Sequence, residues 1–450
     1  MPESVTRLLA ETLAGLRPED MPSEVLEATE RTVLDWLGSA LAGSLEAPAR
    51  MAQTVAGGFG ASEEATVFGT GRASAAAAAF ANGVASHILE LDDVHKGSTL
   101  HGAAPIIPAA LAVAEREHAG GRAFLLAVAA GYEAALRIGE AVNPSHYRFW
   151  HPTGTAGTFG AAAAAGTLLR LDAGQMRDAL GSAGTQAAGL WEFNADGSMS
   201  KHLHPGKAAM NGVLSADLAR AGFTGASRIL EGERGFFRAM SERHNASRII
   251  AGLGVHWKIA ENCFKMHSCC GHTHTAIDAA LALRSVGPAC AAHIEMYGPG
   301  YEIVKERNPR TPYQAKFSAA YTVAAALVEG RVGLEQFATG RFGPDGVCDP
   351  AIAALLASTR VTVAGDLTAR YPAAWPARVT VTLESGETRM ACADYPRGNP
   401  ENPVSTEELE QKFHALVSPR FGKDAARRAI ETVRALEACP DMANAFAQIL

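Results

Sequence analysis

Apolar residues recur at helical spacing along the first two-thirds of the chain. Positions three and four residues apart share one face of a helix, so this spacing predicts a succession of amphipathic helices. Many of these apolar positions are Ala or Gly, whose small side chains let helix axes approach closely. We therefore expect a tightly packed helical domain with several nearly buried helices. The expected helices cover residues 5–16, 75–90, 105–115, 123–143, 157–169, 173–190 and 208–221, and one more, capped by Ser23, has an apolar face from Val25 to Leu41.

Beyond about residue 260 the pattern changes. Alternating residues at 378–383, a Ser385-Gly386 turn and a second run at 388–391 predict a β-hairpin. Further strands are expected at 293–297 and 360–363, helices at 319–329 and 351–359, a turn-rich connector at 397–405, and helices again from 406 to 450. We predict a mainly α protein. Residues 1–262 and 406–450 would form a large all-helical domain, and residues 263–405 an inserted, smaller α+β domain.

Composition limits the class of protein and its partners. The chain has 450 residues, 48% of them hydrophobic and 19% charged, which is typical of a globular protein with two or more domains. The formal net charge of -7 gives no reason to expect nucleic acid or an anionic membrane as a partner. No apolar run is long enough to span a bilayer, and the N-terminal residues lack a basic region followed by an apolar core, so we expect a soluble, cytoplasmic protein. The seven cysteines are expected to be reduced.

The segment from Leu89 to Gly102 interrupts the apolar helices with two aspartates, two histidines and a lysine. Charged groups between buried segments are costly to desolvate unless they are paired or used. A functional site is therefore expected here. Read alone, Asp92, Asp93, His95 and His101 also have the composition of a metal site.

Two further segments suit anions. His151 precedes a run of Thr and Gly, including Thr155, that leads into the helix expected from Gly157. Free N–H groups and threonine hydroxyls at a helix start would bind a carboxylate, with His151 as acid or base. Lys201 and Lys207 precede the helix expected at 208–221, where a lysine opposes the helix dipole unless an anion compensates. The alternatives are a capping histidine in the first segment and a solvated basic loop in the second.

The fourth segment runs from Lys265 to His274 and is rich in Cys and His. Its adjacent cysteines, Cys269 and Cys270, and its alternating histidines do not match the usual spacing of zinc ligands, and no second ligand pair follows. A cysteine nucleophile is the weaker alternative, and buried structural Cys and His are the default. The chain also lacks a phosphate-binding loop, a dinucleotide fingerprint, and the HExxH and GxSxG motifs. We therefore expect cofactor-free chemistry by Asp, His and Lys, with Tyr as a further candidate.

Taken together and in this order, the segments resemble the MmgE/PrpD family, which includes 2-methylcitrate dehydratase, cis-aconitate decarboxylase and iminodisuccinate epimerase. The resemblance covers nearly the whole chain. It rests on DDVH with His101 and the following PAALA, on HPTGTAG, KHLHPGKAA, the segment from Lys265 to His274, KFS at 316–318 and GNPENP at 398–403.

The resemblance implies a large helical domain from the N- and C-terminal segments, a smaller α+β lid domain and an active site in the cleft between them. It also implies a homodimer that works on small di- and tricarboxylates without metal. Carried over by position, the catalytic residues are Asp93, His101, His151 and Lys201. Residues expected to bind the substrate, from the resemblance or from the anion-binding segments, are Lys265, His272, Lys207, Thr155 and Cys270.

Three positions depart from the family pattern. Val94 stands where many members have Thr, and Gly102 replaces the Pro that commonly follows the histidine at His101. Cys269 and Cys270 lie near the place where cis-aconitate decarboxylase has a lid histidine, so decarboxylation ranks third among the reactions considered.

Proton removal next to a carboxylate concentrates negative charge, which cations and helix N-termini can stabilise without a metal. We predict a lyase of the hydratase/dehydratase type on a small hydroxy polycarboxylate such as a 2-methylcitrate-like acid. His101 and His151 would be its acid and base, Asp93 would orient them or share protons, and the lysines would bind carboxylates. The alternatives are an epimerase of an iminodisuccinate-like amino diacid, then a cis-aconitate-type decarboxylase. A non-catalytic dimeric binding protein is the alternative from a different class.

Overall fold

The computed structural model describes residues 4–446, which fall into two compact units. The first contains the chain up to residue 88, residues 92–262 and the chain from residue 405 onward. The second contains residues 89–91 and 263–404. Helices make up 58% of the chain and the sheets are small, which confirms the predicted mainly α class.

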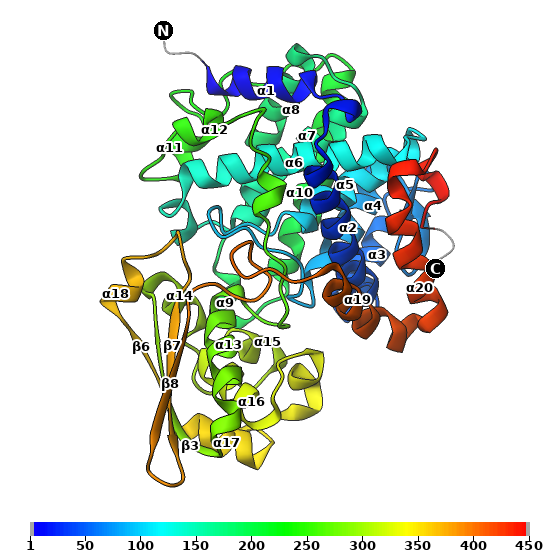
Figure 1. Cartoon of the computed structure of the whole chain (residues 1–450). Helices are drawn as coiled ribbons and strands as arrows, with labels where there is room; N and C mark the ends of the chain where they lie inside the picture. Colours follow the sequence, from blue (N-terminus) through cyan, green and yellow to red (C-terminus); the bar gives the residue numbers. More distant parts are fainter. Residues whose placement is uncertain (1–3, 447–450) are drawn as a thin grey trace. The chain divides into compact units, whose positions relative to one another are not determined.

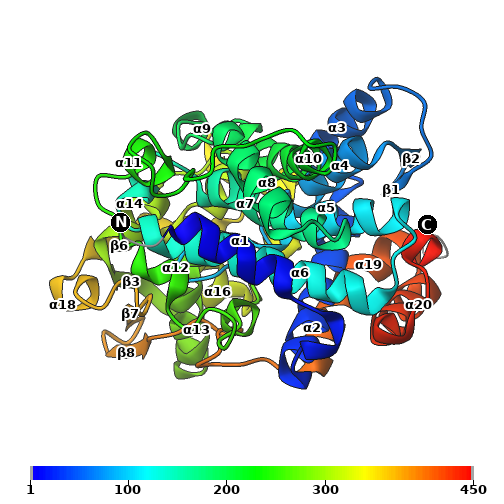
Figure 2. The ribbon, with the colours of Figure 1, turned by 90° about the horizontal axis from the view of Figure 1, so that it is seen from above.

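The first unit consists almost entirely of helices (Figure 1). The N-terminal helix α1 packs across α8 and α12 (Figure 2). A two-stranded hairpin, β1–β2, corrects the all-helical prediction, because its three-residue strands are too short to show an alternating pattern. The elements are α1 (Val5–Gly15), α2 (Ser23–Gly43), α3 (Ala47–Gly57), β1 (Ala65–Val67), β2 (Gly71–Ala73), α4 (Ala75–His87), α5 (Ala103–Arg116), α6 (Gly121–Val142), α7 (Pro152–Leu168), α8 (Ala173–Gln186), α9 (Phe193–Asp196), α10 (Ser200–Arg220), α11 (Phe236–Met240), α12 (Ser247–Ile250), α19 (Thr406–Phe421) and α20 (Lys423–Arg434).

Helix α7 runs through the core of this unit, with α5, α6, α8 and α10 around it. Its residues are small and nearly all buried. A Cβ atom on Gly160 would lie 2.7 Å from the Cβ of Ala135 and 2.8 Å from the carbonyl oxygen of Gly131 on α6, so only glycine permits this approach. Close packing through small residues, as expected from the sequence, therefore holds the middle of α7 against α6.

The C-terminal helices complete the first unit. Ser405 caps α19 in a capping box with Glu408, and α19 packs against α2 (Figure 1). Between these helices Lys412 Nζ lies 2.6 Å from Asp35 Oδ1, and both side chains are buried. A buried pair resists separation because either charge alone would be left uncompensated. This ion pair therefore holds α19 against α2.

The second unit contains a four-stranded sheet in the order β6-β3-β7-β8. Strand β3 pairs parallel with β6 and antiparallel with β7, and β7 and β8 form the predicted hairpin around Gly386. Helices α13, α16 and α17 pack against the sheet (Figure 1). The action of this unit as a lid stays a prediction. The elements are α13 (His274–Leu283), β3 (Ala289–Met296), α14 (Gly298–Val304), α15 (Pro312–Lys316), α16 (Ala319–Glu329), β4 (Phe342–Gly343), β5 (Gly346–Val347), α17 (Pro350–Ala357), β6 (Thr359–Val363), α18 (Gly365–Thr368), β7 (Ala377–Leu383) and β8 (Thr388–Ala393).

Two predicted helix starts were wrong. Helix α7 begins at Pro152 and not at Gly157, so His151 is its N-cap residue. Proline at the first helical position costs nothing, because that N–H has no partner within the helix. Helix α10 begins at Ser200, eight residues before the predicted start at Ala208. Lys201 and Lys207 therefore lie on a helix and not in a loop before one.

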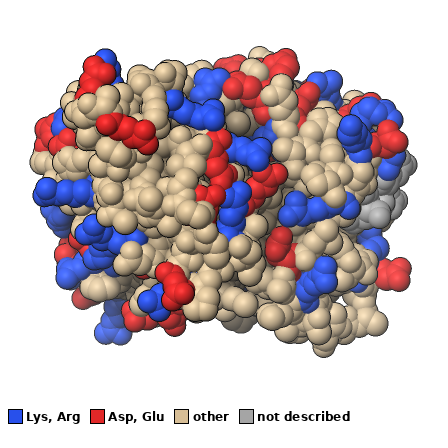
Figure 3. Space-filling view, turned by 90° about the horizontal axis from the view of Figure 1, so that it is seen from below, with Lys and Arg blue, Asp and Glu red and all other residues tan. Residues whose placement is uncertain are grey.

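Basic and acidic side chains intermingle with wide uncharged areas on the face shown in Figure 3. Charges of opposite sign lie close together here, and dissolved salt screens exposed charges beyond about 10 Å at ordinary ionic strength, so this face has no extended field of one sign. Among the described residues, no helix combines the length and apolar character needed to cross a membrane.

Candidate active site

Asp92 is the carboxylate that faces the imidazoles. Its Oδ2 atom lies 2.6 Å from Nδ1 of His87, at the end of α4, and 3.5 Å from Nδ1 of His101. Asp92 and His87 are both fully buried. A buried carboxylate stabilises an imidazolium that forms beside it. Asp92 was not among the catalytic residues predicted from the sequence.

Asp93, the predicted catalytic carboxylate, points the other way. It accepts hydrogen bonds from the backbone N–H of Ala103 (3.0 Å) and from the hydroxyl of Tyr132 (2.5 Å). Burial raises the pKa of Asp93 to about 7, although the Tyr132 bond opposes the rise. Its backbone oxygen lies 2.6 Å from Nδ1 of His101. Asp93 thus holds the start of α5 and orients His101, while a role for its carboxyl in proton transfer stays a prediction.

The glycine at position 102 is explained by the same contacts. A Cβ atom there would lie 2.6 Å from Cε1 of Tyr132, so any other residue would collide with this ring. The ring is fully buried, and its hydroxyl is committed to Asp93. The departure from proline at Gly102 therefore makes room for the Tyr132–Asp93 pair.

His151 is a buried imidazole at the N-cap of α7. Its Nδ1 lies 3.1 Å from Nδ1 of His204 on α10, while its buried Nε2 has no hydrogen-bond partner within residues 4–446. Burial, followed by the charges of His204, His87 and Lys201, lowers the pKa of His151 well below its usual value. The ring is therefore neutral at physiological pH, and a nitrogen is left for a ligand to satisfy.

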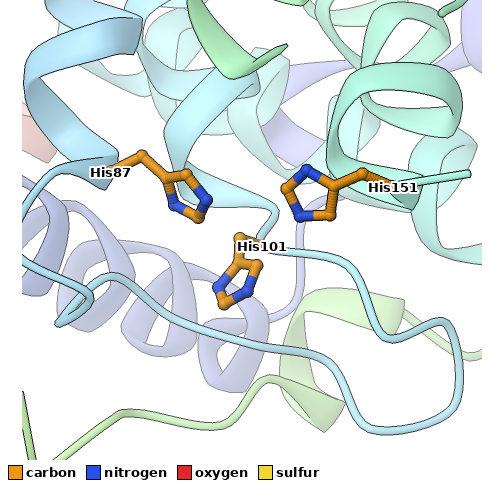
Figure 4. A group of neighbouring side chains, drawn as sticks. All are labelled: His87, His101 and His151. Carbon is orange, nitrogen blue, oxygen red and sulfur yellow. The ribbon is translucent and has the colours of Figure 1, made fainter. Parts of the chain in front are cut away.

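Three imidazoles converge from different elements (Figure 4). The ring of His87 lies edge-on to His101 at 4.8 Å between centroids and stacks on His151 at 5.7 Å. The ring centroids of His101 and His151 are 6.1 Å apart. The hydroxyl of Thr153, in the first turn of α7, accepts a hydrogen bond from the backbone N–H of His101 (3.1 Å). The loop after α4 is thereby attached to the start of α7, which brings the predicted His101 and His151 together.

Helix α10 brings Lys201 and His204 to this cluster. It approaches α4 so closely that a Cβ atom on Gly83 would lie 2.8 Å from Cα of Gly206. Lys201 is 2% exposed, and its charge contributes to lowering the pKa values of both His151 and His204. In a buried, low-dielectric setting an ammonium attracts a negatively charged group more strongly than it would in water. The predicted Lys201 therefore lies where a carboxylate would be favoured.

Two residues that were predicted to bind the substrate form hydrogen bonds to other groups of the chain. Lys207 Nζ donates to the carbonyl of Gln186, the last residue of α8 (3.0 Å). The Nδ1 atom of His146 lies 2.9 Å from the carbonyl of Met240, to which it must donate, so its Nε2 accepts from the hydroxyl of Thr155 (2.7 Å). Burial lowers the pKa of His146 to about 4, which keeps that tautomer neutral. Lys207 and Thr155 thus support the framework of the first unit.

The remaining predicted residues belong to the second unit. Lys265 Nζ lies 3.5 Å from Glu90 Oε2, and both side chains are 1% exposed. Nearby, Lys316 Nζ and the Ser268 hydroxyl both donate to the carbonyl of Leu89, at 3.0 and 2.7 Å. This unit thus has two buried lysines around residues 89–91.

His272 and the adjacent cysteines are also buried in the second unit. Nδ1 of His272 lies 2.5 Å from the hydroxyl of Tyr297. Cys269 contacts the hydroxyl of Thr273, and burial raises the pKa of the Cys269 thiol to about 12. Since the thiolate is the nucleophilic form, Cys269 does not have the environment of a nucleophile. The predicted Cys270 is buried and forms no disulfide.

Sequence reasoning missed His87 and His204. His87 ends an alanine-rich helix, where a single histidine is usually a core residue. The separation of five residues between His87 and Asp92 indicates a contact only when α4 is known to end at His87. His204 follows Lys201 by three residues, a spacing that places both on one face of a helix, but the segment was interpreted as a loop.

Within the described chain, two groups of side chains could hold a metal ion. His87, His101 and His151 form one, with ligand atoms within 4.8 Å of one another. His95, Glu140 and Glu261 form the other. In the second group Lys258 Nζ already lies 3.1 Å from Glu140 and 3.0 Å from Glu261, so the carboxylates are compensated.

Comparison with known proteins identifies both parts of the chain. Residues 7–249 match the MmgE/PrpD N-terminal domain, and residues 267–438 match the MmgE/PrpD C-terminal domain. The chain is 28% identical to a cis-aconitate decarboxylase-like protein, oryM, of Aspergillus oryzae, over 99% of this chain and 97% of that protein. It is also 28% identical to human cis-aconitate decarboxylase, over 98% of this chain and 93% of that one. The cis-aconitate decarboxylase of Aspergillus terreus is 29% identical over 74% of each chain.

Proposed function

The chain belongs to the MmgE/PrpD family, and from this premise we propose that it is a lyase that moves a proton at a carbon next to a carboxylate of a small di- or tricarboxylate. The observation that carries the proposal is the contrast between imidazole environments in one cluster. Burial and positive neighbours lower the pKa of His151, whereas His87 and His101 lie beside the Asp92 carboxylate. Enzymes obtain a base and an acid from groups whose surroundings differ in this way.

The neighbouring charges suit an anionic substrate. Proton removal next to a carboxylate leaves an electron pair that spreads onto the carboxylate oxygens. The buried Lys201 ammonium supplies the opposite charge, and it is near enough to lower the pKa values of both His151 and His204. In a site that excludes water, such a fixed charge stabilises the developing anion more than it would in solution. In this proposal His101 and His151 exchange protons with the substrate while Lys201 holds the carboxylate.

Among lyase reactions, decarboxylation of a cis-aconitate-like tricarboxylate is favoured first. The relatives described above bear that activity in their names, and two of them match this chain over nearly its whole length. The C–C bond to the departing carboxylate breaks, carbon dioxide leaves, and the electron pair remaining on the substrate takes a proton from an imidazolium. An imidazolium of His101 would be stabilised by Asp92, 3.5 Å away.

Dehydration of a hydroxy polycarboxylate, the first choice from the sequence, is the second candidate. Cys269 and Cys270 favour it, because they lie near the place where the resemblance puts the lid histidine of cis-aconitate decarboxylase. Burial raises the pKa of the Cys269 thiol to about 12, so this residue does not replace an imidazole. In a dehydration one imidazole would take the carbon-bound proton, and another would protonate the departing hydroxyl to give water. The homodimer and the cytoplasmic location stay predictions.

The test is proton NMR of the wild-type protein in D2O with cis-aconitate, citrate and 2-methylcitrate, together with an assay for released carbon dioxide. The proposal predicts net conversion of at least one compound. Carbon dioxide would mark decarboxylation, and a new alkene signal without it would mark dehydration. Solvent exchange without net conversion would contradict a lyase and favour an epimerase. Neither exchange nor conversion would favour a binding protein.

A further inference from the structure

We propose that His87 is a third catalytic imidazole of this site, held by Asp92, and that one proton passes between the substrate and its Nε2 atom. The inference rests on the proposed function and adds a residue that neither the motifs nor the comparisons assign. His87 lies at the last position of α4, before the charged loop. Its side chain is fully buried, so the reactive atom would contact bound substrate and not bulk water.

Asp92 fixes the tautomer of His87. The 2.6 Å contact between Asp92 Oδ2 and His87 Nδ1 joins two fully buried groups. An ionised carboxylate only accepts hydrogen bonds, so Nδ1 of His87 carries the hydrogen. In the neutral ring the lone pair is then on Nε2. The arrangement is that of a histidine oriented by an aspartate, in which the opposite ring nitrogen is the one that accepts a proton.

The Nε2 atom of His87 is prepared for a ligand. It is buried and has no hydrogen-bond partner among residues 4–446. Buried polar atoms in proteins are nearly always satisfied, so an unsatisfied one calls for a ligand or a functional reason. Nε2 of His151 is in the same state, and the two rings stack at 5.7 Å with 27° between their planes (Figure 4). Two orphaned imidazole nitrogens side by side would be satisfied by one bound molecule.

The charges around the cluster support transfer of a proton to His87. When the substrate C–H bond breaks, its proton binds Nε2 and its electron pair stays on the carbon, conjugated with the carboxylate. The imidazolium of His87 then has Asp92 at Nδ1, while Lys201 compensates the substrate anion. In the decarboxylation no C–H bond needs to break: loss of carbon dioxide leaves the electron pair on the substrate carbon, and an imidazolium of His87 gives its Nε2 proton to that carbon. Asp92 Oδ2 is also 3.5 Å from Nδ1 of His101, so it can stabilise a positive charge on either ring.

A metal ion is the competing occupant of the same three rings. Zinc–nitrogen bonds of 2.0–2.1 Å in a tetrahedral site place ligand nitrogens about 3.3 Å apart. The ligand atoms of His87, His101 and His151 span up to 4.8 Å. The positive charge of Lys201, which already lowers the pKa of His151, would also oppose a divalent cation. The geometry and the charges therefore favour proton transfer over metal binding.

The experiment compares the wild-type protein with His87→Gln, Asp92→Asn and, as control, His118→Gln. His118 also pairs with an aspartate, Asp441, at 2.9 Å, but on the exposed surface. His87→Gln should lower kcat by about 100-fold or more, which is typical for loss of a general acid or base, with KM within about threefold. Deuterium incorporation from D2O should fall by the same factor. Asp92→Asn should lower kcat and shift its pH profile, and His118→Gln should change neither.

The results separate this inference from the proposed function. A wild-type protein that converts substrate, with His87→Gln retaining kcat and exchange within threefold, would overturn the role of His87 and leave the lyase standing. A wild-type protein without turnover would remove both. If His87→Gln does not fold by circular dichroism, Asp92→Asn decides, because it keeps the ring, and an unchanged pH profile would overturn the proposal. Stoichiometric metal whose chelation abolishes turnover, with zinc restoring it, would also overturn it.

Discussion

Replacing Asp93 by asparagine should change the free energy of unfolding in a pH-dependent way. The value for Asp93→Asn minus that for wild type should be larger at pH 8 than at pH 5. The Asp93 carboxyl is fully buried between Ala103 and Tyr132, and burial raises its pKa to about 7. An asparagine keeps the shape of this contact. Its amide oxygen can accept from the Ala103 N–H, and its amide nitrogen can donate to the Tyr132 oxygen. In wild type these two groups lie 3.0 and 2.5 Å from the Asp93 oxygens. The substitution therefore removes the charge but not the packing.

The sign follows from the direction of the pKa change. The folded state binds the Asp93 proton more tightly than the unfolded state, whose pKa is near 3.8, so ionisation penalises folding. One pKa unit corresponds to about 1.4 kcal/mol, and the full penalty above pH 7 is therefore about 4 kcal/mol. The penalty is absent below pH 3.8 and develops as the pH rises. Between pH 5 and pH 8, it grows by about 2–3 kcal/mol in wild type and not in Asp93→Asn.

Urea unfolding at pH 5 and pH 8, followed by tryptophan fluorescence, measures this difference. The free energy of unfolding of Asp93→Asn minus that of wild type should increase by about 2–3 kcal/mol between the two pH values. Asp20→Asn, at an exposed position, should follow wild type and controls for the substitution itself. If the difference for Asp93→Asn is the same at both pH values, the pKa of Asp93 is not raised and the description of this contact is wrong.

Other substitutions test the framework and the anion site. Lys201→Ala should lower kcat by about 100-fold or more without loss of helical circular dichroism, because it removes the buried charge beside the imidazoles; near-normal turnover would remove Lys201 from the mechanism. Gly83→Ala should lower stability by about 1–3 kcal/mol in thermal melts, since its Cβ would lie 2.8 Å from α10. The control Gly57→Ala, whose Cβ meets nothing within 4 Å, should be neutral or stabilising. Arg137→Met should cost about 3–5 kcal/mol in urea unfolding, because the buried guanidinium bonds Glu133 and four backbone carbonyls; an unchanged midpoint would contradict this.

Periodic segments were predicted well because their local pattern and their packing agree. Helix α16 has the predicted bounds, and the strands of the β7–β8 hairpin lie within two residues of the predicted ones. Errors arose where proline and glycine were taken as signs of a loop. Pro205 lies inside α10, and Gly206 follows it because α4 leaves no room for a Cβ. Tertiary packing overrides local preference at such contacts, and a single sequence does not show which helix will be the neighbour.

The site was predicted in part for the same reason. His101, His151 and Lys201 stand out because they interrupt apolar surroundings, and the structure brings these three to one cluster in the first unit. The roles of the adjacent aspartates could not be assigned, because neighbours in sequence can point in opposite directions. Asp92 faces the imidazoles, and Asp93 faces Tyr132. His87 resembled an ordinary core residue until the end of α4 was known.

Transfer of solvent deuterium by wild type and His151→Gln tests the central claim most directly. The claim is that the imidazole cluster moves a proton at a carbon next to a carboxylate. In D2O, wild type should decarboxylate a cis-aconitate-like polycarboxylate to a product that carries deuterium at the carbon that takes up the proton. His151→Gln should keep the melting temperature within a few degrees and lose both conversion and labelling by about 100-fold or more. An unlabelled decarboxylation product of wild type, or full labelling by a folded His151→Gln protein, would contradict the account.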